Sequence, residues 1–299
     1  MDKNPFVKAY QRKATIMELP FDPLTVSASE LEVYSKVKLK ILKDQVSLFQ
    51  DFARTIADEI RTNNEANKAT RLILPVGPVG QYPLLVQICN RERISWHNTH
   101  TFNMDEYCDW QGRWIPEDHP LSFRGIMQRV LFDRLDPELC IPSEQAHFPD
   151  PLNLDRISQD IKAVGGIDTC YGGIGYHGHI AFNEPPISRW FRISIDEYKN
   201  SKTRVVSLAD DSIVMNSIRN TGGNPEKLPP MAVTLGMADI LASLRIRIYC
   251  PGGMWQRHTV RMALLGEPQV EYPATLLQGH SDYMICLDTE TAQPAIYTS

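Results

Sequence analysis

Short apolar runs that end in glycine or polar residues recur along this chain, and patterns typical of helices separate them. A strand from Leu72 to Leu74 with a Gly/Pro turn after it is predicted by RLILPVGPVG, and GIDTCYGGIG predicts a strand that runs into glycines. A strand running into Asp105 and Glu106 is predicted by ISWHNTHTFNMDEY. Strands that alternate with helices indicate an α/β fold with a mostly parallel sheet. Three more strands are predicted within MAVTLGMADIL, LRIRIYCPGG and YMICLDTE.

The longest helical pattern lies before the first of these strands and ends at Asn63 and Asn64. Shorter helices are predicted from Gln81 to Asn90 and from Gln256 to Leu265, the second of which Gly266 stops. In the longest pattern, apolar residues recur at three- and four-residue steps and form one stripe, which is typical of a helix packed on a core. The stripe consists of Val46, Phe49, Ala53, Ile56 and Ile60.

The chain of 299 residues suits a single large domain, and no linker interrupts it. Residues 1–32 are predicted to be an N-terminal arm, because the segment up to about residue 26 has no apolar period and contains three prolines. Ser27 and Glu30 have the spacing of a helix capping box. Residues 33–299 form the predicted domain.

The net charge and the cysteines indicate which partners and which cellular compartment to expect. The net charge is -5 and no basic run occurs, so nothing indicates a nucleic-acid partner. No apolar stretch is long enough to predict a membrane span. The six cysteines are widely spaced, and Cys170, Cys250 and Cys286 lie in strand-like apolar runs, which predicts buried free thiols. These features together predict a protein of the cytoplasm.

Three polar or glycine-rich segments follow predicted strands. They are the turn from Gly77 to Gly80, the pair Asp105 and Glu106, and the loop from Gly172 to Glu184. In parallel α/β folds, ligands bind beyond the carboxyl ends of the strands. The three segments are therefore expected to converge on one active site.

The acidic pair supports two interpretations. Asp105 and Glu106 follow apolar Phe102 and Met104, and burial would raise the pKa of a carboxyl group and make it a usable general base. The alternative is a solvated turn whose aspartate caps a helix.

The loop GGIGYHGHIAFNEP contains both flexible backbone and proton-transfer groups. Gly173 and Gly175 allow the backbone to approach a ligand closely. His179 with Glu184 can shuttle protons near neutral pH. His177, His179 and Glu184 also have a spacing that metals use, and His-x-His followed by Glu occurs in cupins. Cupins are all-β barrels, however, so the alternating strands and helices favour a site without metal.

The turn LPVGPVGQY follows a strand and precedes a helix, where an anion would meet the helix N-terminus. It lacks the nucleotide-binding pattern G-x-x-x-x-G-K-[ST], so nucleotide binding is unsupported. Between Gly77 and Gly80 stand Pro78 and Val79, with no serine, threonine or lysine.

The chain resembles the glucosamine-6-phosphate deaminase/isomerase family, which shares a fold with 6-phosphogluconolactonases. Two stretches carry the likeness, TFNMDEY at 101–107 and GGIG-x-x-GHIAFNEP at 172–185, and it covers roughly residues 45 to 290. The resemblance implies a doubly wound sheet of modified Rossmann type, a small sugar or amino sugar as substrate, and no metal or other cofactor. Members are often homo-oligomers, which leaves that state open here.

The resemblance also implies a reaction and its catalytic residues. The family opens a pyranose ring, moves a proton between C2 and C1, and releases ammonia or isomerises an aldose to a ketose. By resemblance, Asp105 is the base at C2, His179 is the acid–base group of ring opening, and Glu184 is its carboxylate partner. Glu106 is the second acid of the same motif.

Several positions depart from the family pattern. His177 stands where the family has an aspartate, and Pro78 and Val79 replace small hydroxyl residues of the phosphate turn. The family's phosphate-binding arginine and lysine fall on Ile213 and Gln256. These losses predict a substrate-binding site, formed by residues 77–80, Gly173, Gly175, His177 and Gln256, for a sugar without the usual phosphate.

The stretch PISRWFRISIDEYKNS follows the second motif and contains an insertion of about ten residues, which brings Arg189, Trp190 and Arg192. It predicts either a remodelled pocket for an acidic, bulkier or unphosphorylated sugar or a solvated surface loop. Two other functions stay open on the same fold: hydrolysis of a sugar lactone, and sugar sensing without catalysis.

Overall fold

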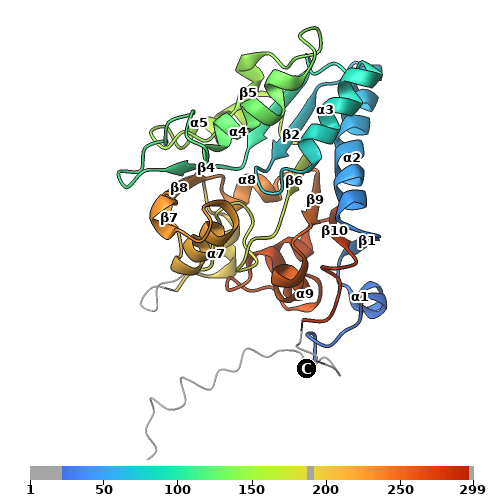
Figure 1. The fold of residues 1–299 in the computed structure, drawn as a ribbon, viewed down its shortest axis with the longest axis vertical. Helices are drawn as coiled ribbons and strands as arrows, with labels where there is room; N and C mark the ends of the chain where they lie inside the picture. Colours follow the sequence, from blue (N-terminus) through green and yellow to red (C-terminus); the bar gives the residue numbers. More distant parts are fainter. Residues whose placement is uncertain (1–21, 187–191, 296–299) are drawn as a thin grey trace, which may run out of the picture.

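The computed structural model describes residues 22–186 and 192–295. Seven parallel strands form the main sheet in the order β1-β10-β9-β6-β2-β3-β5, and three antiparallel strands form a second sheet in the order β4-β8-β7 (Figure 1). The predicted α/β class with a mostly parallel sheet is confirmed. The strands are β1 (Lys38–Leu42), β2 (Thr70–Leu74), β3 (Thr99–Asn103), β4 (Asp105–Cys108), β5 (Ala146–His147), β6 (Thr169–Gly172), β7 (Arg204–Ser207), β8 (Met231–Thr234), β9 (Arg245–Cys250) and β10 (Tyr283–Asp288).

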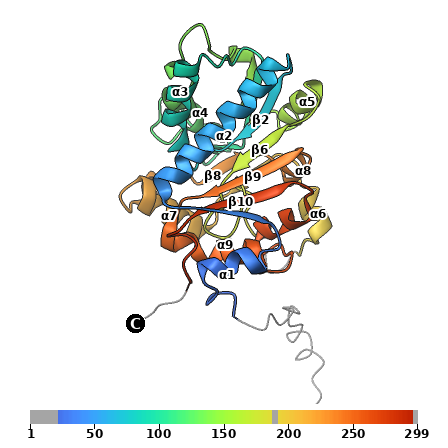
Figure 2. The same ribbon diagram turned by 90° about the vertical axis from the view of Figure 1, so that its right-hand side faces the viewer.

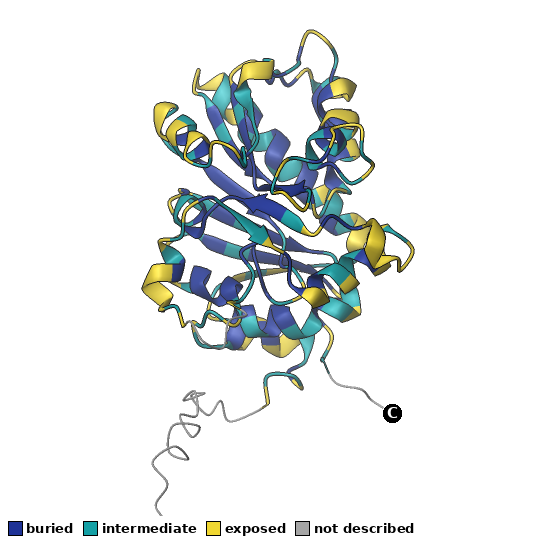
Figure 3. Cartoon of the chain, turned by 90° about the vertical axis from the view of Figure 1, so that its left-hand side faces the viewer, coloured by how far each residue is buried: buried dark blue, intermediate teal, exposed yellow. Residues whose placement is uncertain are grey.

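Helices cover both faces of the main sheet, so it is doubly wound. Ile73 of β2 belongs to one hydrophobic cluster and its neighbours Leu72 and Leu74 to another, because successive side chains of a strand point to opposite faces. Figure 2 shows α2 lying across the strands, and Figure 3 shows the buried strands between more exposed helices. The helices are α1 (Ala28–Tyr34), α2 (Gln45–Glu65), α3 (Gln81–Glu92), α4 (Phe123–Val130), α5 (Arg156–Ala163), α6 (Ile195–Lys199), α7 (Asp210–Asn220), α8 (Met237–Leu241) and α9 (Arg257–Leu265).

The apolar stripe predicted for α2 is confirmed only in its second half. Ala53, Ile56 and Ile60 are fully buried, whereas Val46 is 63% exposed. Val46 is two residues from the buried Leu48, which places it about 200° around the helix and away from the sheet.

The strand predicted from ISWHNTHTFNMDEY is in fact two strands in different sheets. β3 pairs with β2 and ends at Asn103, and β4 starts at Asp105 and pairs with β8. Met104 is the junction, because its N–H donates to the Leu74 carbonyl at 3.1 Å and its carbonyl accepts from the Leu235 N–H at 2.7 Å. The second sheet therefore begins with Asp105, next to the carboxyl end of β2.

The order in which the strands join the sheet creates a crevice between β2 and β6. From β2 the sheet grows through β3 to β5 on one side, and on the other side through β6 to β9 and β10. Loops that leave neighbouring strands in opposite directions open a space at the carboxyl ends of the strands.

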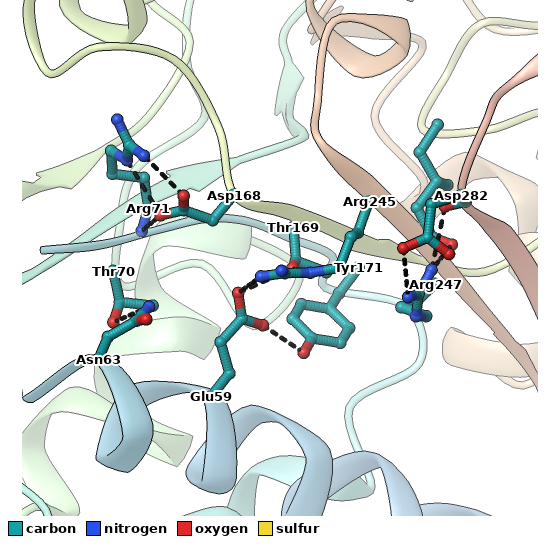
Figure 4. A network of polar contacts seen from close by, with 11 residues as sticks. Glu59, Asn63, Thr70, Arg71, Asp168, Thr169, Tyr171, Arg245, Arg247 and Asp282 are labelled. Atoms are coloured by element: carbon teal, nitrogen blue, oxygen red, sulfur yellow. Dashed lines mark hydrogen bonds and ion pairs between the residues drawn. The ribbon is translucent and has the colours of Figure 1, made fainter. Parts of the chain in front are cut away.

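A network of polar contacts fixes α2 against β6 and β9 (Figure 4). The Glu59 carboxylate accepts hydrogen bonds from Thr169 Oγ1 at 2.8 Å and Tyr171 Oη at 2.7 Å, and it forms an ion pair with Arg245. Because the carboxylate is mostly buried and fully partnered, its charge is compensated. The network fixes α2, and with it Phe49 in its first turns, relative to the crevice.

The N-terminal boundary predicted between residues 32 and 33 falls inside α1 and stays a prediction. The predicted capping box is present, since Ser27 Oγ accepts from the Glu30 N–H and the Glu30 carboxylate accepts from the Ser27 N–H. Leu31 is completely buried, and Arg261 of α9 donates to the Val26 carbonyl at 2.7 Å. Figure 2 shows α1 beside α9. The prediction of an arm for residues 1–21 lies outside the described residues.

The predicted state of the cysteines is confirmed. All six are free thiols, and Cys170, Cys250 and Cys286 are fully buried in strands. Along the described ranges, no helix combines the length and the apolar character that crossing a membrane requires.

Candidate active site

A cavity of about 540 Å³ lies at the carboxyl ends of β2, β3, β6 and β9. Most of the predicted site residues line it, whereas Glu106, His177 and Glu184 lie outside the lining. The predicted convergence of three loops is therefore observed. The predicted residues that line the cavity are Gly77, Pro78, Val79, Gly80, Asp105, Gly173, Gly175, His179 and Gln256.

Asp105 provides a carboxyl group in the cavity wall. It is 6% exposed, and within the described parts of the chain no group donates a hydrogen bond to its side chain. Burial, together with the neighbouring charge of Glu106, raises the pKa of Asp105 to about 8. A carboxylate that is poorly solvated and has a raised pKa is suited to proton abstraction near neutral pH.

Glu106 points away from the cavity and is fully buried. Its carboxylate accepts from the N–H groups of Tyr107, Phe123 and Arg124 at 2.7–2.9 Å and from Ser122 Oγ at 2.9 Å. Three of these donors belong to Ser122, Phe123 and Arg124 at the start of α4, so Glu106 caps that helix. The contacts support a positioning role in place of the catalytic role predicted from its motif.

His179 is seated by a glycine. A Cβ atom on Gly175 would lie 1.8 Å from His179 Nε2, so no other residue at 175 leaves room for the ring. The Nδ1 atom is buried without a hydrogen-bond partner, which leaves Nε2 as the nitrogen able to reach a substrate. Burial and the nearby His177 lower the pKa of His179 to about 3, so the ring is neutral at pH 7.

Glu184 lies close to His179, and its predicted role as the carboxylate partner stays a prediction. Its Oε2 accepts from the Ala209 N–H at 2.7 Å, while Oε1 is buried without a partner. Burial raises the pKa of Glu184. Side-chain ligand atoms of Glu184, His177 and His179 all lie within 4.8 Å of one another, so Glu184 is near His179, although His179 Nδ1 and Glu184 Oε1 have no hydrogen-bond partner.

The same three residues are of the kind that bind zinc or iron, two imidazoles and one carboxylate. The unpartnered His179 Nδ1 and Glu184 Oε1 fit such a role. The expectation of a site without metal therefore stays a prediction.

His177, which occupies the position of the family's aspartate, contacts a carboxylate from a helix. Its Nε2 is hydrogen-bonded to the Asp211 carboxylate of α7, and Ser212 Oγ lies 3.5 Å from Nδ1. The centroids of the His177 and His179 rings are 5.8 Å apart. Helix α7 thus supplies a carboxylate, that of Asp211, but this carboxylate is hydrogen-bonded to His177 and not to His179. Asp211 could not be predicted from the sequence, because no local pattern relates positions 177 and 211.

The turn after β2 is shaped by packing. A Cβ on Gly80 would meet the Phe49 ring at 2.6 Å, and one on Gly173 would meet Pro78 Cδ at 3.0 Å. The Gln256 amide is engaged at both ends, since Oε1 accepts from the Gly252 N–H and Nε2 donates to the Ile174 carbonyl, both at 2.6 Å. Substrate binding by these residues stays a prediction.

Other positions of the sequence analysis fall outside the cavity. Ile213 packs against the small hydrophobic cluster of the second sheet. Arg189 and Trp190 lie outside the described residues, and Arg192 is exposed. Arg219 of α7 and Trp255 line the cavity instead, and neither was predicted from the sequence.

Comparison with known proteins identifies relatives of this chain, although no family model matches it. A glucosamine-6-phosphate deaminase of Phocaeicola vulgatus is 31% identical over 261 residues, which cover 84% of this chain and 91% of that protein. Glucosamine-6-phosphate deaminase 2 of Giardia intestinalis is 32% identical over 259 residues, covering 85% and 88%. The chain belongs to the glucosamine-6-phosphate deaminase family.

Solved structures agree with membership of the glucosamine-6-phosphate deaminase family. A monomeric glucosamine-6-phosphate deaminase superimposes with a TM-score of 0.73 at 28% identity, covering 86% of this chain and 99% of that one. A 6-phosphogluconolactonase from Thermotoga maritima gives a TM-score of 0.59 at 20% identity, covering 84% and 99%, and shows the shared fold alone. The resemblance stated from the two motifs is confirmed.

Proposed function

We propose that this protein is an amino-sugar deaminase or aldose–ketose isomerase that opens a sugar ring and transfers a proton from C2, acting on a substrate without the usual 6-phosphate. The observation that carries the proposal is the Asp105 carboxyl group, which is buried, lacks a hydrogen-bond donor in the described residues and faces the same cavity as His179.

Ring opening is assigned to His179. As a neutral imidazole it takes the proton of the O1 hydroxyl, and the imidazolium that forms gives this proton to O5 as the C1–O5 bond breaks, so the aldehyde forms without net change in protons. Glu184, within 4.8 Å, stabilises the imidazolium that forms transiently.

Proton transfer is assigned to Asp105. Its carboxylate takes the proton from C2 of the open chain, which yields an enediol from an aldose or an enolamine from an amino sugar. Return of a proton to C1 gives the ketose, or an imine that water hydrolyses to ketose and ammonia. A base with a pKa near the working pH suits both halves of this transfer.

The altered substrate is inferred from the turn at residues 77–80 and from Gln256. Pro78 has no N–H to donate, Val79 is apolar, and the amide of Gln256 is already occupied by backbone groups. None of these side chains supplies a positive charge to a phosphate. A preference for an unphosphorylated or differently charged sugar follows.

The test combines a substrate panel with Asp105→Asn. Glucosamine, glucosamine 6-phosphate and related aldoses are incubated with the enzyme, and ammonia and ketose are followed together. The variant is expected to bind the best substrate with unchanged affinity and to lose turnover by about 10²-fold or more, because the C2 proton has no acceptor. Asp118→Asn, an exposed aspartate outside the cavity, is the matched control.

Three results would contradict the proposal. They are unchanged turnover in Asp105→Asn, hydrolysis of a sugar lactone without ketose or ammonia, and tight sugar binding without any turnover. A strong preference for glucosamine 6-phosphate would refute the altered substrate alone.

A further inference from the structure

Two buried polar atoms beside the cavity have no partner. His179 Nδ1 and Glu184 Oε1 are both buried, and neither forms a hydrogen bond with any group in the described parts of the chain. The other oxygen of Glu184 accepts from the Ala209 N–H at 2.7 Å, which fixes the carboxylate in place. Buried polar atoms without a partner are costly, so a nitrogen and an oxygen that are both ligand atoms call for an explanation.

His177 supplies a third ligand atom. Ligand atoms of His177, His179 and Glu184 all lie within 4.8 Å of one another. Around one tetrahedral zinc ion the ligand atoms are about 3.4 Å apart, because bonds from zinc to nitrogen and oxygen are about 2.1 Å long. A zinc ion would therefore draw the three side chains together by up to about 1.4 Å. Two imidazoles and one carboxylate are a ligand set that zinc sites use.

Asp211 holds the His177 ring in an orientation that suits a metal ligand. Its carboxylate is hydrogen-bonded to His177 Nε2, and the nearest hydrogen-bonding group printed for Nδ1 in the described residues is Ser212 Oγ, at 3.5 Å. Histidines that bind zinc usually donate their other N–H to a carboxylate, which fixes the ring and its tautomer. The carboxylates of Asp211 and Glu184 together match the double charge of the ion. The Asp211 side chain is 56% exposed, so an ion can enter from solvent at the start of α7.

We propose that His177, His179 and Glu184 bind a zinc ion and that this ion reversibly inhibits the enzyme. When the lone pair of His179 Nδ1 binds zinc, the proton of the neutral ring is on Nε2. Nε2 then cannot accept the proton of the sugar's O1 hydroxyl, and Glu184 cannot stabilise an imidazolium, so ring opening stops. The inhibition rests on the proposed function, whereas zinc binding does not. Since the ion is an inhibitor, the proposed reaction itself still uses no metal.

His177 thereby has a role that explains its departure from the family's aspartate. An aspartate at this position would leave one imidazole in the set, whereas His177 adds the second, and nitrogen ligands suit zinc better than additional carboxylates.

The test titrates zinc into metal-free protein by isothermal titration calorimetry and records the visible absorption of bound cobalt(II), which intensifies in a tetrahedral site. Wild-type protein is expected to bind one ion per chain at the site and to show this absorption. His177→Asn should weaken zinc binding by about 100-fold or more and remove the absorption, because a ligand nitrogen is lost. Asp211→Asn should weaken zinc binding by about 10- to 100-fold, because it removes only the group that orients the ring.

His97→Asn and Asp210→Asn are the matched controls, since both residues are exposed and neither belongs to the three-residue set. Both variants should bind zinc as wild type does, and circular dichroism checks that every variant is folded. Absence of zinc binding in wild type, or equal affinity in wild type and His177→Asn, overturns the site.

Inhibition is measured separately, as turnover of the best substrate with zinc and again after chelation with EDTA. Turnover should fall as the site fills and should return when zinc is removed. Undiminished turnover at full occupancy overturns the inhibition. A protein that converts no sugar at all contradicts the proposed function, and the zinc titration and the cobalt spectrum still decide the site.

Discussion

At the scale of single residues, ionisation of the buried Asp105 carboxyl group destabilises the fold, and the proposed catalysis needs the ionised form. A carboxyl group in the wall of a cavity, without a donor in the described residues, is poorly solvated when it ionises. The folded protein therefore favours the protonated form, while catalysis as proposed uses the carboxylate. Replacing Asp105 by asparagine should therefore raise the stability of the folded protein at high pH and lower its activity.

The prediction for Asp105→Asn concerns stability against pH. Because burial raises the pKa of Asp105 to about 8, the folded state binds a proton that the unfolded state has released between about pH 4 and pH 8. The stability contributed by Asp105 is complete below its unfolded pKa and is lost as the pH rises through about 8. Asn cannot ionise, so the variant should be more stable than wild type by about 1–3 kcal/mol at pH 9, and the gain should shrink toward pH 4.

Urea unfolding at several pH values provides the measurement. Asp118→Asn, which changes an exposed carboxylate, should show no comparable trend. A gain that is equal at pH 5 and pH 9 would assign the effect to something other than ionisation of Asp105.

At the scale of elements, the sequence predicted the loops better than the side chains that support them. Apolar runs ending in polar residues were sufficient to place the turn after β2, Asp105 and the His179 loop at one edge of the sheet, because parallel strands end together. The exchange of sheets at Met104 was not predictable, since it depends on pairing between β4 and the distant β8. Asp211 and Arg219 were missed because α7 reaches the site only through tertiary packing.

A variant of Glu106 tests whether this residue acts in catalysis or supports the structure around α4. Its carboxylate accepts from donors at the start of α4, and Gln would place an amide group among N–H donors. Glu106→Gln should lower the free energy of unfolding by about 3–5 kcal/mol, as breaking a buried, hydrogen-bonded charge does. Denaturant unfolding monitored by circular dichroism measures the change.

Glu117→Gln is the matched control, because Glu117 approaches the same Arg124 at 3.9 Å and its side chain is 58% exposed. This second variant should change stability by less than about 0.5 kcal/mol. If Glu106→Gln were as stable as wild type but inactive, the catalytic role first predicted for Glu106 would be supported after all.

At the scale of the whole molecule, residues 26–31 pack against the body of the fold that carries the site. Val26 is nearly fully buried, Leu31 is fully buried in the larger hydrophobic cluster, and the buried Arg261 donates to the carbonyls of Val26 and Ala292 at 2.7 and 2.9 Å. Arg261 thereby joins the beginning and the end of the described chain to α9. The same helix follows directly after Trp255 and Gln256 of the cavity wall.

Removal of residues 1–32 should therefore destabilise the domain. Loss of two buried side chains of about 1.5–3 kcal/mol each, together with the acceptor of Arg261, predicts a fall of about 4 kcal/mol in the free energy of unfolding. A chain that starts at residue 22 keeps all these contacts and is the control for the deletion. The two truncated chains are compared by thermal and urea unfolding. Equal stability of both would support the boundary at residue 33, whereas loss of stability only in the shorter chain would place α1 within the domain.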